Sequence, residues 1–279
     1  MDDPPPRSNQ SPPPKPSTSP ADTSERVVFR GPAAIEARDH VVIEEPLEIR
    51  VEDRSLAITM RTPGHDRELA AGFLLTEGVI DGAEDLTAIG GLPGDRQQNT
   101  IVARVAGGVQ AHLEAIERAS RELFATSACG VCGKVSLDRL QILARSPIQP
   151  LEPDPAVLAR LPDALRDAQP TFRRTGGLHA AALVTPDGVL EVVREDIGRH
   201  NAADKVLGWR VLRDQVPVSD RILLVSGRAG FEIVQKARVA GVPVVAAIGA
   251  ASSLAVDLAS SSGIVLIGFL RPDRWTRYA

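Results

Sequence analysis

The sequence predicts an α/β fold in which a mixed sheet is layered with helices and preceded by a smaller β-rich part. From residue 180 onward, stretches with helical spacing alternate with short apolar strands, as in sheets that helices cover and that are at least partly parallel. Before residue 106, several segments alternate apolar and polar side chains with the period of a strand. The 279-residue chain is 43% hydrophobic and 24% charged, which is enough apolar material for one sizeable core or two smaller ones.

The bulk charge and the hydropathy pattern exclude several classes of protein. The formal net charge is -4, whereas proteins that bind nucleic acid usually carry a strong basic excess. No run of about 18 apolar residues is present, and the N-terminus lacks the basic-then-apolar layout of a secretory signal. We therefore expect a cytoplasmic protein that neither binds nucleic acid nor spans a membrane.

Residues 1–25 are predicted to form a disordered arm. Eight prolines stand there among Ser, Asn and Asp, a composition that cannot bury a core. The β-rich part, residues 26–145, opens with strand-like sequence from Val27. Within it, residues 47–51 and 56–60 alternate on either side of a polar turn, which predicts a β-hairpin.

The remaining elements of the β-rich part follow from local signals. A helix is predicted over residues 66–76, because Asp66 can cap its start and Gly78 can end it. Short strands are expected at residues 86–89 and 100–105, and a further helix at residues 113–123. The glycine-rich segment that follows, residues 127–134, contains both cysteines and is predicted to be a loop or a helix entrance.

A proline-rich connector is predicted at residues 146–170, although residues 156–168 can make a helix between the prolines. The α/β part, residues 171–279, follows it. Its strands are expected at residues 180–184 and 189–193, on either side of a Thr-Pro-Asp-Gly turn, and at residues 222–225, 243–248 and 264–269. Its helices are expected at residues 201–212, 231–240 and 253–259.

The most reactive side chains are those of Cys129 and Cys132, the two cysteines of the chain. In a reducing compartment so close a pair is more typical of chemistry than of a structural disulfide. A structural zinc site would need a second cysteine pair or two closely spaced histidines, and neither is present. The zinc deaminase pattern also fails, because the His-x-Glu and the Pro before the cysteines are missing. We therefore expect no structural metal.

Three interpretations of the cysteine pair remain. A thioredoxin-like dithiol normally follows the first strand of a βαβ unit, whereas this pair lies mid-chain after a helix. A sulfur carrier needs one exposed thiolate, which Gly130, Gly133 and Lys134 can favour through backbone N–H groups and a positive charge. Two buried cysteines acting as small apolar residues are the third interpretation, which the flanking glycines and lysine do not favour.

Four segments after predicted strands or at helix starts are candidate binding elements. Residues 225–228 form a strand-to-helix turn that suits a phosphate-bearing ligand, although such a turn is often only a turn. Residues 194–201 are densely polar, and a solvated helix start is the alternative explanation. Residues 249–253 repeat the strand-to-helix turn with a capping serine. Residues 268–274 follow the last long strand and carry two arginines, with a charged tail as the alternative.

Five motifs taken together resemble the formate dehydrogenase accessory sulfurtransferase family, FdhD, over roughly residues 27–279. The motifs are Ala-Cys-Gly-Val-Cys-Gly-Lys from Ala128, Gly-Gly-Leu-His from Gly176, Arg-Glu-Asp-Ile-Gly-Arg-His-Asn-Ala-Ala-Asp-Lys from Arg194, Ser-Gly-Arg from Ser226 and Gly-Phe from Gly268. The resemblance implies a fold similar to cytidine deaminases without their zinc chemistry, and a homodimer. It also implies that sulfur passes from a cysteine desulfurase to the molybdenum bis(molybdopterin guanine dinucleotide) cofactor of formate dehydrogenase.

The resemblance also implies roles for individual residues. Cys129 matches the persulfide-bearing cysteine, Cys132 matches the second cysteine, and residues 269–274 match the stretch that binds the cofactor. With these we group the polar residues of the other candidate segments. The full set expected at the cofactor is Phe269, Leu270, Arg271, Pro272, Asp273, Arg274, Ser226, Gly227, Arg228, His200, Lys205 and Lys134, the two lysines as partners of anions.

Two departures from the family pattern concern the affinity for the cofactor rather than the chemistry. Ala128 stands where the family often has Ser, and Trp275-Thr276 replaces the usual Phe-Asn. Two other functions stay open at this point. A cofactor-binding chaperone without chemistry would not need Cys129, and a thiol-disulfide oxidoreductase would need Cys129 and Cys132 equally.

Overall fold

The computed structural model describes residues 22–279, apart from residues 33, 93, 95–98 and 127–146. Its strands are β1 (Thr23–Arg30), β2 (Ile35–Val42), β3 (Glu45–Val51), β4 (Arg54–Arg61), β5 (Leu86–Gly91), β6 (Thr100–Val105), β7 (His179–Val184), β8 (Leu190–Asp196), β9 (Ile222–Val225), β10 (Val244–Ala247), β11 (Val265–Gly268) and β12 (Thr276–Arg277). Its helices are α1 (Asp66–Thr76), η2 (Ala83–Asp85), α2 (Gly108–Ala111), α3 (Leu113–Thr126), α5 (Pro155–Asp167), α6 (Pro170–Thr175), α7 (Arg199–Val211), α8 (Phe231–Ala240) and α9 (Ser253–Ser262).

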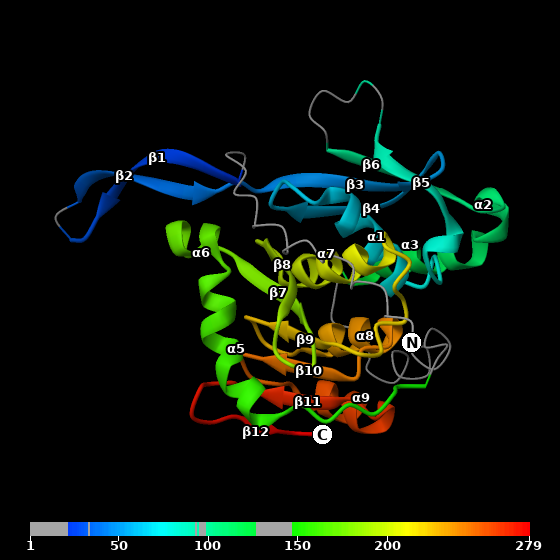
Figure 1. Ribbon diagram of the computed structural model, residues 1–279. Coiled ribbons are helices and arrows are strands. Elements are labelled where there is room, and N and C mark those ends of the chain that lie inside the picture. The colour runs from blue at the N-terminus through cyan, green and yellow to red at the C-terminus, as the bar shows by residue number, and fades with distance from the viewer. Residues whose placement is uncertain (1–21, 33, 93, 95–98, 127–146) are drawn as a thin grey trace, which may run out of the picture.

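These strands form a two-stranded sheet, a four-stranded sheet in the order β4-β3-β6-β5, and a six-stranded sheet in the order β12-β11-β10-β9-β7-β8 (Figure 1). In the largest sheet β9, β10 and β11 are parallel, whereas β7 runs antiparallel to both β8 and β9. The predicted alternation of helices and strands in the second half is confirmed. So is the fold class, a mixed sheet layered with helices.

The β1–β2 hairpin extends away from the body of the molecule (Figure 1). Its first strand begins at Thr23, so the prediction that the disordered arm runs to residue 25 is wrong for its last three residues. Residues 23–25 instead belong to β1 and pair with β2, in an antiparallel register that runs from Thr23 opposite Val42 to Arg30. Residues 1–21 lie outside the described residues, and the disorder of that arm stays a prediction.

The predicted hairpin of the β-rich part is confirmed as β3 and β4, which pair antiparallel. On β3 the expected alternation holds, since Leu47, Ile49 and Val51 are fully buried. On β4 it fails, because the register shifts between Ile49 and Arg50, which turns Ala57 inward and leaves Ile58 71% exposed. Strand β6 pairs parallel with β3, and β5 pairs antiparallel with β6. The inner face of this sheet therefore covers one end of the hydrophobic core.

Helix α1 has the predicted bounds, but its start is built differently from the prediction. The residue that caps it is His65, in the left-handed conformation with φ 59°, and no side chain caps the helix. Asp66 instead receives hydrogen bonds from Nε and Nη2 of Arg61, both at 3.0 Å. Because Arg61 is only 1% exposed, its guanidinium must be paired inside the protein, and the Asp66 carboxylate meets that need.

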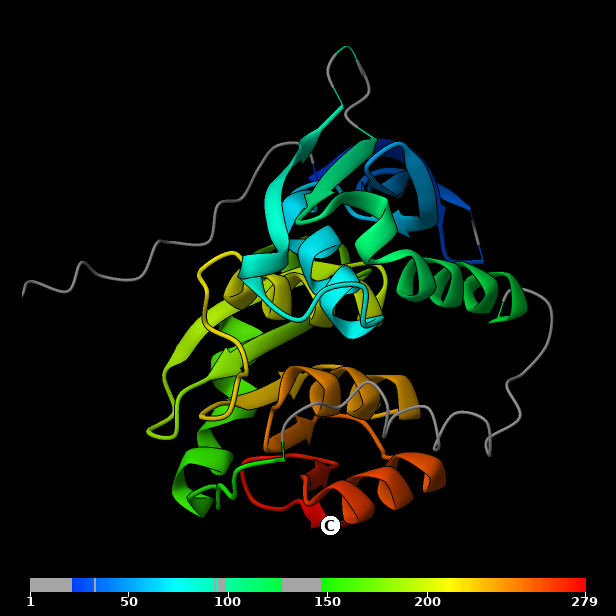
Figure 2. The ribbon, with the colours of Figure 1, turned by 90° about the vertical axis from the view of Figure 1, so that its right-hand side faces the viewer.

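The six-stranded sheet is covered on both faces. Helices α7, α8 and α9 lie on one face, and α5 lies on the other, where Leu158, Leu161 and Leu165 pack against strand residues such as Ala182 and Leu224. Helix α1 lies between α7 and the four-stranded sheet (Figure 2). The alternation of side chains along β7 and β9 divides them between the two cores.

The segment expected to be a connector contains helix α5. Asp154 caps this helix by accepting a hydrogen bond from the Ala156 N–H at 2.8 Å, and Pro155 occupies the first turn, where its missing N–H costs nothing. The helix then buries its apolar stripe on the six-stranded sheet. Among the described residues, no helix is both long and apolar enough to cross a membrane.

Candidate functional site

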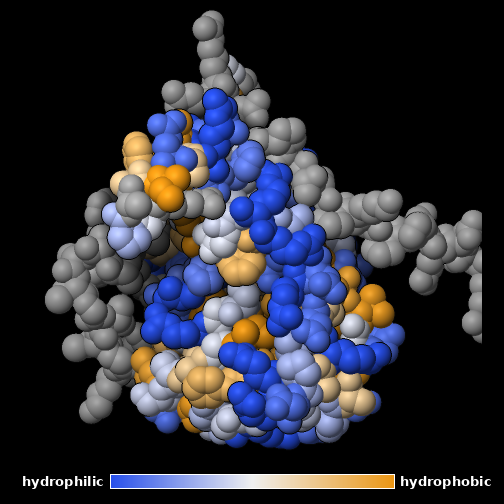
Figure 3. Space-filling view, turned by 90° about the vertical axis from the view of Figure 1, so that its left-hand side faces the viewer, coloured by the Kyte–Doolittle hydropathy of each residue, from blue (hydrophilic) through white to orange (hydrophobic). Residues whose placement is uncertain are grey.

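The turns predicted to bind a ligand meet at one edge of the six-stranded sheet. Strands β9, β10 and β11 are parallel, so their carboxyl ends point to the same side. Strand β7 runs the opposite way and therefore begins there, with His179. This edge is the place where open α/β sheets commonly bind ligands. It faces the viewer in Figure 3, where hydrophilic residues predominate.

Close backbone contacts fix the three turns at this edge. The Gly249 N–H donates to the Gly227 carbonyl, and the Phe269 N–H donates to the Gly249 carbonyl, both at 2.9 Å. A side chain at Gly249 would place its Cβ 2.7 Å from the Gly227 oxygen, so this crossing requires glycine. The Ser226 hydroxyl accepts from the Ala180 N–H at 2.9 Å, which joins the first turn to β7.

The larger of two neighbouring pockets, which we call the α5–α6 pocket, has a volume of about 560 Å³. One wall comes from α5, α6 and the turn after α6, and the other comes from the sheet edge. Its lining mixes apolar and polar side chains: Pro162, Leu165, Arg166, Gln169, Phe172, Gly176, Gly177, Leu178, His179, Ser226, Ile248 and Arg271. A concave site of this size with a few polar groups is typical of a small-molecule pocket.

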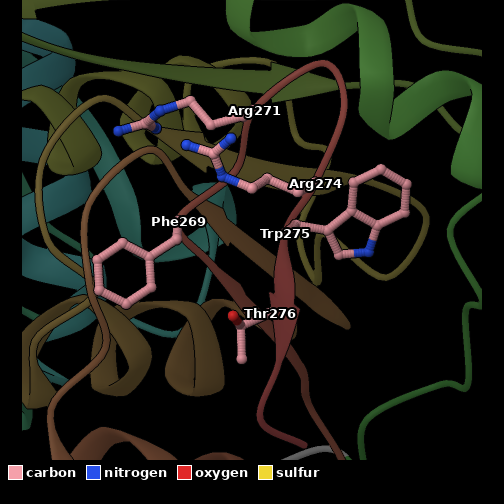
Figure 4. Close-up of a pocket in the computed structure, with 5 residues that line it drawn as sticks. All are labelled: Phe269, Arg271, Arg274, Trp275 and Thr276. Carbon is pink, nitrogen blue, oxygen red and sulfur yellow. The ribbon is translucent and has the colours of Figure 1, made fainter.

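The smaller pocket, which we call the arginine pocket, has a volume of about 270 Å³ and follows β11. It is lined by Phe269, Arg271, Arg274, Trp275 and Thr276. Figure 4 shows the guanidinium groups of Arg271 and Arg274 close together, with the two aromatic rings on either side of them. Arg271 lines both pockets, so the two pockets are neighbours at this edge.

Arg271 is held in place by the turns that it joins. Its Nη1 donates to the carbonyls of Ile248, at 2.8 Å, and Leu270, at 2.7 Å. These bonds use one nitrogen of the guanidinium fork, and further donors remain for an anion. The fork matches the geometry of phosphate and carboxylate oxygens, so the arginine pocket suits an anionic group.

Phe269 has a strained backbone at the mouth of the arginine pocket. Its φ is 53°, in the left-handed region that a bulky residue rarely adopts, and its side chain is 48% exposed. The hydrogen bond from its N–H to Gly249 holds this conformation. An exposed aromatic ring on a strained backbone is the kind of feature that clusters at binding sites.

Two histidines, His179 and His200, lie on the β7 side of this edge. Burial lowers the pKa of His179, and the positive charges of Arg199 and His200 lower it further. His179 is therefore neutral at physiological pH and can both donate and accept a hydrogen bond in the α5–α6 pocket. His200 lies outside that pocket lining, with its Nε2 2.6 Å from a carboxylate oxygen of Glu232, and this contact lowers the pKa of Glu232.

Comparison with known proteins identifies the chain's relatives. A model of the FdhD/NarQ family matches residues 42–279. The chain belongs to this family. It is 51% identical over 249 residues to the sulfur carrier protein FdhD of Streptomyces coelicolor, covering 86% of this chain and 87% of that one. It is 47% identical over 247 residues to the sulfur carrier protein FdhD of Corynebacterium efficiens, covering 86% and 89%.

A solved structure agrees with the family assignment. The crystal structure of a protein assigned as a formate dehydrogenase accessory protein from Desulfotalea psychrophila matches with a TM-score of 0.71 and 26% sequence identity, covering 92% of this chain and 95% of that one. The resemblance to FdhD inferred from the five motifs is thereby confirmed.

The predicted site residues Ser226–Arg228, Phe269–Arg274 and His200 of this FdhD family member fall into four groups. Phe269, Arg271, Arg274 and Ser226 line the two pockets. Gly227 belongs to the turn beneath them, where a Cβ would lie 3.4 Å from Nδ1 of His179. Leu270 is fully buried, so its side chain belongs to the core. The remaining four, Arg228, Pro272, Asp273 and His200, lie near the edge but line neither pocket.

Lys205 does not occupy the position that we expected. Its side chain is 1% exposed, and its Nζ lies 2.7 Å from a carboxylate oxygen of Asp196. It also donates to the Thr62 carbonyl at 3.0 Å. The ammonium group of Lys205 is therefore paired inside the protein, where its hydrogen bond to Thr62 links α7 to the end of β4. The prediction that Lys205 stabilises a ligand anion is wrong for this reason.

Cys129, Cys132 and Lys134 lie outside the described residues, so their roles stay predictions. Helix α3, which leads towards them, ends at Thr126. Within the part of the chain that the structure describes, no three His, Cys, Asp or Glu side chains are grouped to hold a metal ion.

Several pocket residues were missed because residues 146–170 were interpreted as a connector. Leu165 and Gln169 come from that segment, and Phe172 lies just beyond it. His179 belongs to one of the five family motifs, so that motif could have indicated this side of the pocket from the sequence. The contribution of Arg166 has no local signature, since an arginine near the end of a helix is ordinary.

Proposed function

We propose that this chain is a sulfur carrier that takes a sulfane sulfur on Cys129 and delivers it to a molybdenum bis(molybdopterin guanine dinucleotide) cofactor. The assignment of a sulfur-carrying function is supported by the relatives named sulfur carrier protein, which are about 50% identical over most of the chain. The paired pockets at the sheet edge support a large anionic acceptor. The cofactor is cargo in this proposal, and formate dehydrogenase is its destination.

Loading of the carrier is an exchange without net oxidation. The Cys129 thiolate attacks the outer sulfur of a persulfide on a cysteine desulfurase. A new S–S bond forms at Cys129, the S–S bond of the donor breaks, and the donor cysteine leaves as a thiolate. In the sequence, Gly130, Gly133 and Lys134 lie within or directly after the cysteine pair and can favour the thiolate form of Cys129.

Release of the sulfur as sulfide requires two electrons. The Cys132 thiolate can supply them by attacking the inner sulfur of the Cys129 persulfide, which forms a Cys129–Cys132 disulfide and expels hydrosulfide. Hydrosulfide then becomes the sulfur ligand of the acceptor. A dithiol reductant returns the disulfide to two thiols before the next cycle.

Binding of the acceptor is assigned to the two pockets. The phosphates of a guanine dinucleotide arm would pair with Arg271 and Arg274, because a guanidinium fork donates two hydrogen bonds to one phosphate. The α5–α6 pocket beyond Arg271 is of the size that a planar heterocycle needs. Homodimerisation, which the family resemblance implies, would place two such sites in one assembly, one for each dinucleotide.

The sulfur step is tested by intact-mass spectrometry after incubation with a cysteine desulfurase and cysteine. The wild-type protein should gain about 32 Da, the mass of one sulfur, and dithiothreitol should reverse the gain. Cys129→Ala should abolish it, whereas Cys132→Ala should load sulfur but fail to release sulfide. Loading that survives Cys129→Ala would refute the assignment to Cys129.

The binding step is tested by calorimetry with guanosine diphosphate, a soluble fragment of the dinucleotide arm. Arg274→Ala should weaken binding by about tenfold, since it removes one charge-assisted contact. Arg277→Ala is the control, because Arg277 pairs with Glu152 and the C-terminal residue rather than lining a pocket. If the wild type fails to bind this probe while still loading sulfur, the cofactor assignment is wrong and the sulfur assignment stands.

A non-catalytic cofactor chaperone remains the second candidate. The observation that favours it is the size of the two neighbouring pockets, which an escort protein would need as much as a carrier does. Formate dehydrogenase matured with Cys129→Ala separates the two functions. An active enzyme would support the chaperone, and an inactive one with its cofactor in place would support the carrier.

A further inference from the structure

Helix α6 is held by a carboxylate from another part of the chain. Glu195, on β8, accepts hydrogen bonds from the backbone N–H groups of Thr171, at 3.0 Å, and Phe172, at 2.7 Å. Each of its two oxygens takes one N–H. Pro170 opens the helix and has no N–H of its own, so Glu195 satisfies the first two donors that the helix presents.

Helix α6 is also tied to the end of α5, because Arg173 donates to the carbonyls of Arg166, at 3.4 Å, and Asp167. It is six residues long, and Gln169, in the capping position, makes no side-chain hydrogen bond to it. A helix so short is not stable by itself. Two hydrogen bonds to a carboxylate are charge-assisted and lie at the positive end of the helix, so they count for more than neutral ones.

The far end of α6 is tied to the hairpin base rather than to the sheet edge. Arg174 donates to the Thr23 hydroxyl at the start of β1, and a Cβ built at Gly177 would lie 2.9 Å from Cγ2 of Val42 on β2. These contacts hold the helix from the side of the hairpin. Glu195 is the contact that fixes it to the six-stranded sheet through β8, next to the strand that begins with His179.

The position of α6 decides the shape of the α5–α6 pocket. Phe172, on α6, and Gly176 and Gly177, just after it, line one wall. His179 and Ser226 line the wall opposite, on the sheet edge. Glu195 lies on the strand beside His179, paired with Ala180 across the β7–β8 ladder. Glu195 therefore helps to set the distance between the two walls, together with the bonds from Arg173 to the end of α5.

We infer that Glu195 is a positioning residue for the α5–α6 pocket, holding Phe172 and the following glycines at the spacing that the acceptor requires. Glu195 itself lines neither pocket and acts through the two N–H groups of α6. The inference about the helix stands on this geometry alone. The identity of the ligand that benefits rests on the function proposed above.

The test compares Glu195→Gln with Glu191→Gln in the full-length protein. Glutamine offers one acceptor oxygen and turns an NH2 group toward the second N–H, so it cannot hold both donors. Glu191 is the matched control, because it lies on the same strand and is also partly buried, but it pairs with Arg210 and Arg221 away from α6. Melting temperatures establish that both variants fold.

Two readouts are taken from each variant. Hydrogen exchange followed by mass spectrometry should show faster exchange for residues 171–176 in Glu195→Gln and wild-type exchange there in Glu191→Gln. The dissociation constant for guanosine diphosphate should rise by up to about tenfold in Glu195→Gln alone, because binding must then reorder α6 without one of its charge-assisted hydrogen bonds. Persulfide loading of Cys129 should be unchanged in both, because the proposed loading step involves the desulfurase and Cys129 and not the bound acceptor.

The outcomes separate the inference from the proposed function. Unchanged exchange at residues 171–176 in Glu195→Gln would overturn the inference, whatever the ligand. Faster exchange with unchanged affinity would overturn it as well, because the helix would then move without affecting the site. If the wild-type protein does not bind guanosine diphosphate, the proposed cofactor is wrong. The exchange data would still decide whether Glu195 holds α6.

Discussion

Gly72 of α1 and Gly208 of α7 face each other where these two helices cross. A Cβ built at Gly72 would overlap the backbone carbonyl of Asp204, and one built at Gly208 would overlap that of Glu68. The helices therefore pack backbone to backbone, with α1 between α7 and the four-stranded sheet (Figure 2). This crossing joins the two halves of the molecule, since α1 belongs to the β-rich part and α7 to the α/β part.

Replacing Gly208 with alanine should destabilise the protein by about 3 kcal/mol, the upper part of the range for overpacked cores. The added methyl group meets backbone atoms, which can yield only if the two helices separate. Urea unfolding monitored by circular dichroism measures the effect. Gly90→Ala is the control, because a Cβ at Gly90 meets nothing within 4 Å, and a comparable loss there would show that the crossing is not the cause.

A buried ion pair lies beside this crossing. Lys236 of α8 donates to a carboxylate oxygen of Asp204 at 2.9 Å and to the Thr76 hydroxyl at 3.0 Å, and the same hydroxyl donates to Asp204. Lys236→Met should cost about 3–5 kcal/mol, because it leaves a buried carboxylate without its partner. The double variant Lys236→Met/Asp204→Leu should be more stable than Lys236→Met alone.

A double-mutant cycle of unfolding free energies measures this coupling. The exposed pair Arg38–Glu25 is the control, with side chains 76% and 50% exposed. Arg38→Met should cost less than about 1 kcal/mol, as for most surface ion pairs. Additive effects of Lys236→Met and Asp204→Leu would mean that the two buried charges do not stabilise one another.

His65 should make stability depend on pH. Burial, reinforced by the positive charge of Arg194, lowers its pKa from 6.5 to about 4 in the folded protein. Between these two pH values the unfolded chain binds more protons at this histidine than the folded protein does. The free energy of unfolding therefore rises as the pH rises from about 4 to 6.5, and the contribution of His65 is lost again on acidification. Urea midpoints measured across this range should show that slope.

His65→Asn should reduce the slope, because asparagine does not titrate and tolerates the left-handed backbone of this residue. The exposed His40 of β2 supplies the control variant, His40→Asn, which should leave the slope as it is in the wild type. A wild-type slope in His65→Asn would assign the pH dependence to other groups.

At Phe269 we expect folding stability and ligand affinity to favour different residues. Its left-handed backbone costs an ordinary residue about 1–2 kcal/mol, a cost that glycine escapes. Phe269→Gly should therefore be more stable than Phe269→Ala by about 1 kcal/mol, whereas both variants should bind guanosine diphosphate more weakly than the wild type. Thermal unfolding and calorimetry give the two quantities. Phe29→Ala, on the distant β1–β2 hairpin, should leave the affinity unchanged.

Elements with strong local signals were predicted well. Helix α8 has the predicted bounds, because Gly241 ends it in a left-handed conformation that glycine adopts at little cost. Ser252 caps α9 as predicted, accepting from the Ala255 N–H at 3.3 Å. In both cases the decisive contacts lie within four residues along the chain, where sequence patterns are informative.

Predictions failed where a charged residue found its partner far along the chain. Asp66 was expected to cap α1 and instead binds Arg61, and Lys205 was expected at a ligand and instead binds Asp196. Both arginine and lysine are buried. Sequence does not reveal which cation will be enclosed, because enclosure depends on how α1, β4 and α7 pack against one another.

The sequence by itself determined the order of helices and strands in the second half, the cysteine pair and the motifs of the FdhD family, because these depend on spacing along the chain. Only the tertiary structure decided which residues share a site. Ser226, Ile248 and Arg271 meet because three parallel strands end at one edge, and Phe172 faces them because α5 packs across the sheet and Glu195 holds α6. A pocket is made by contacts between segments distant in sequence, and those contacts are set by the burial of apolar surface rather than by local pattern.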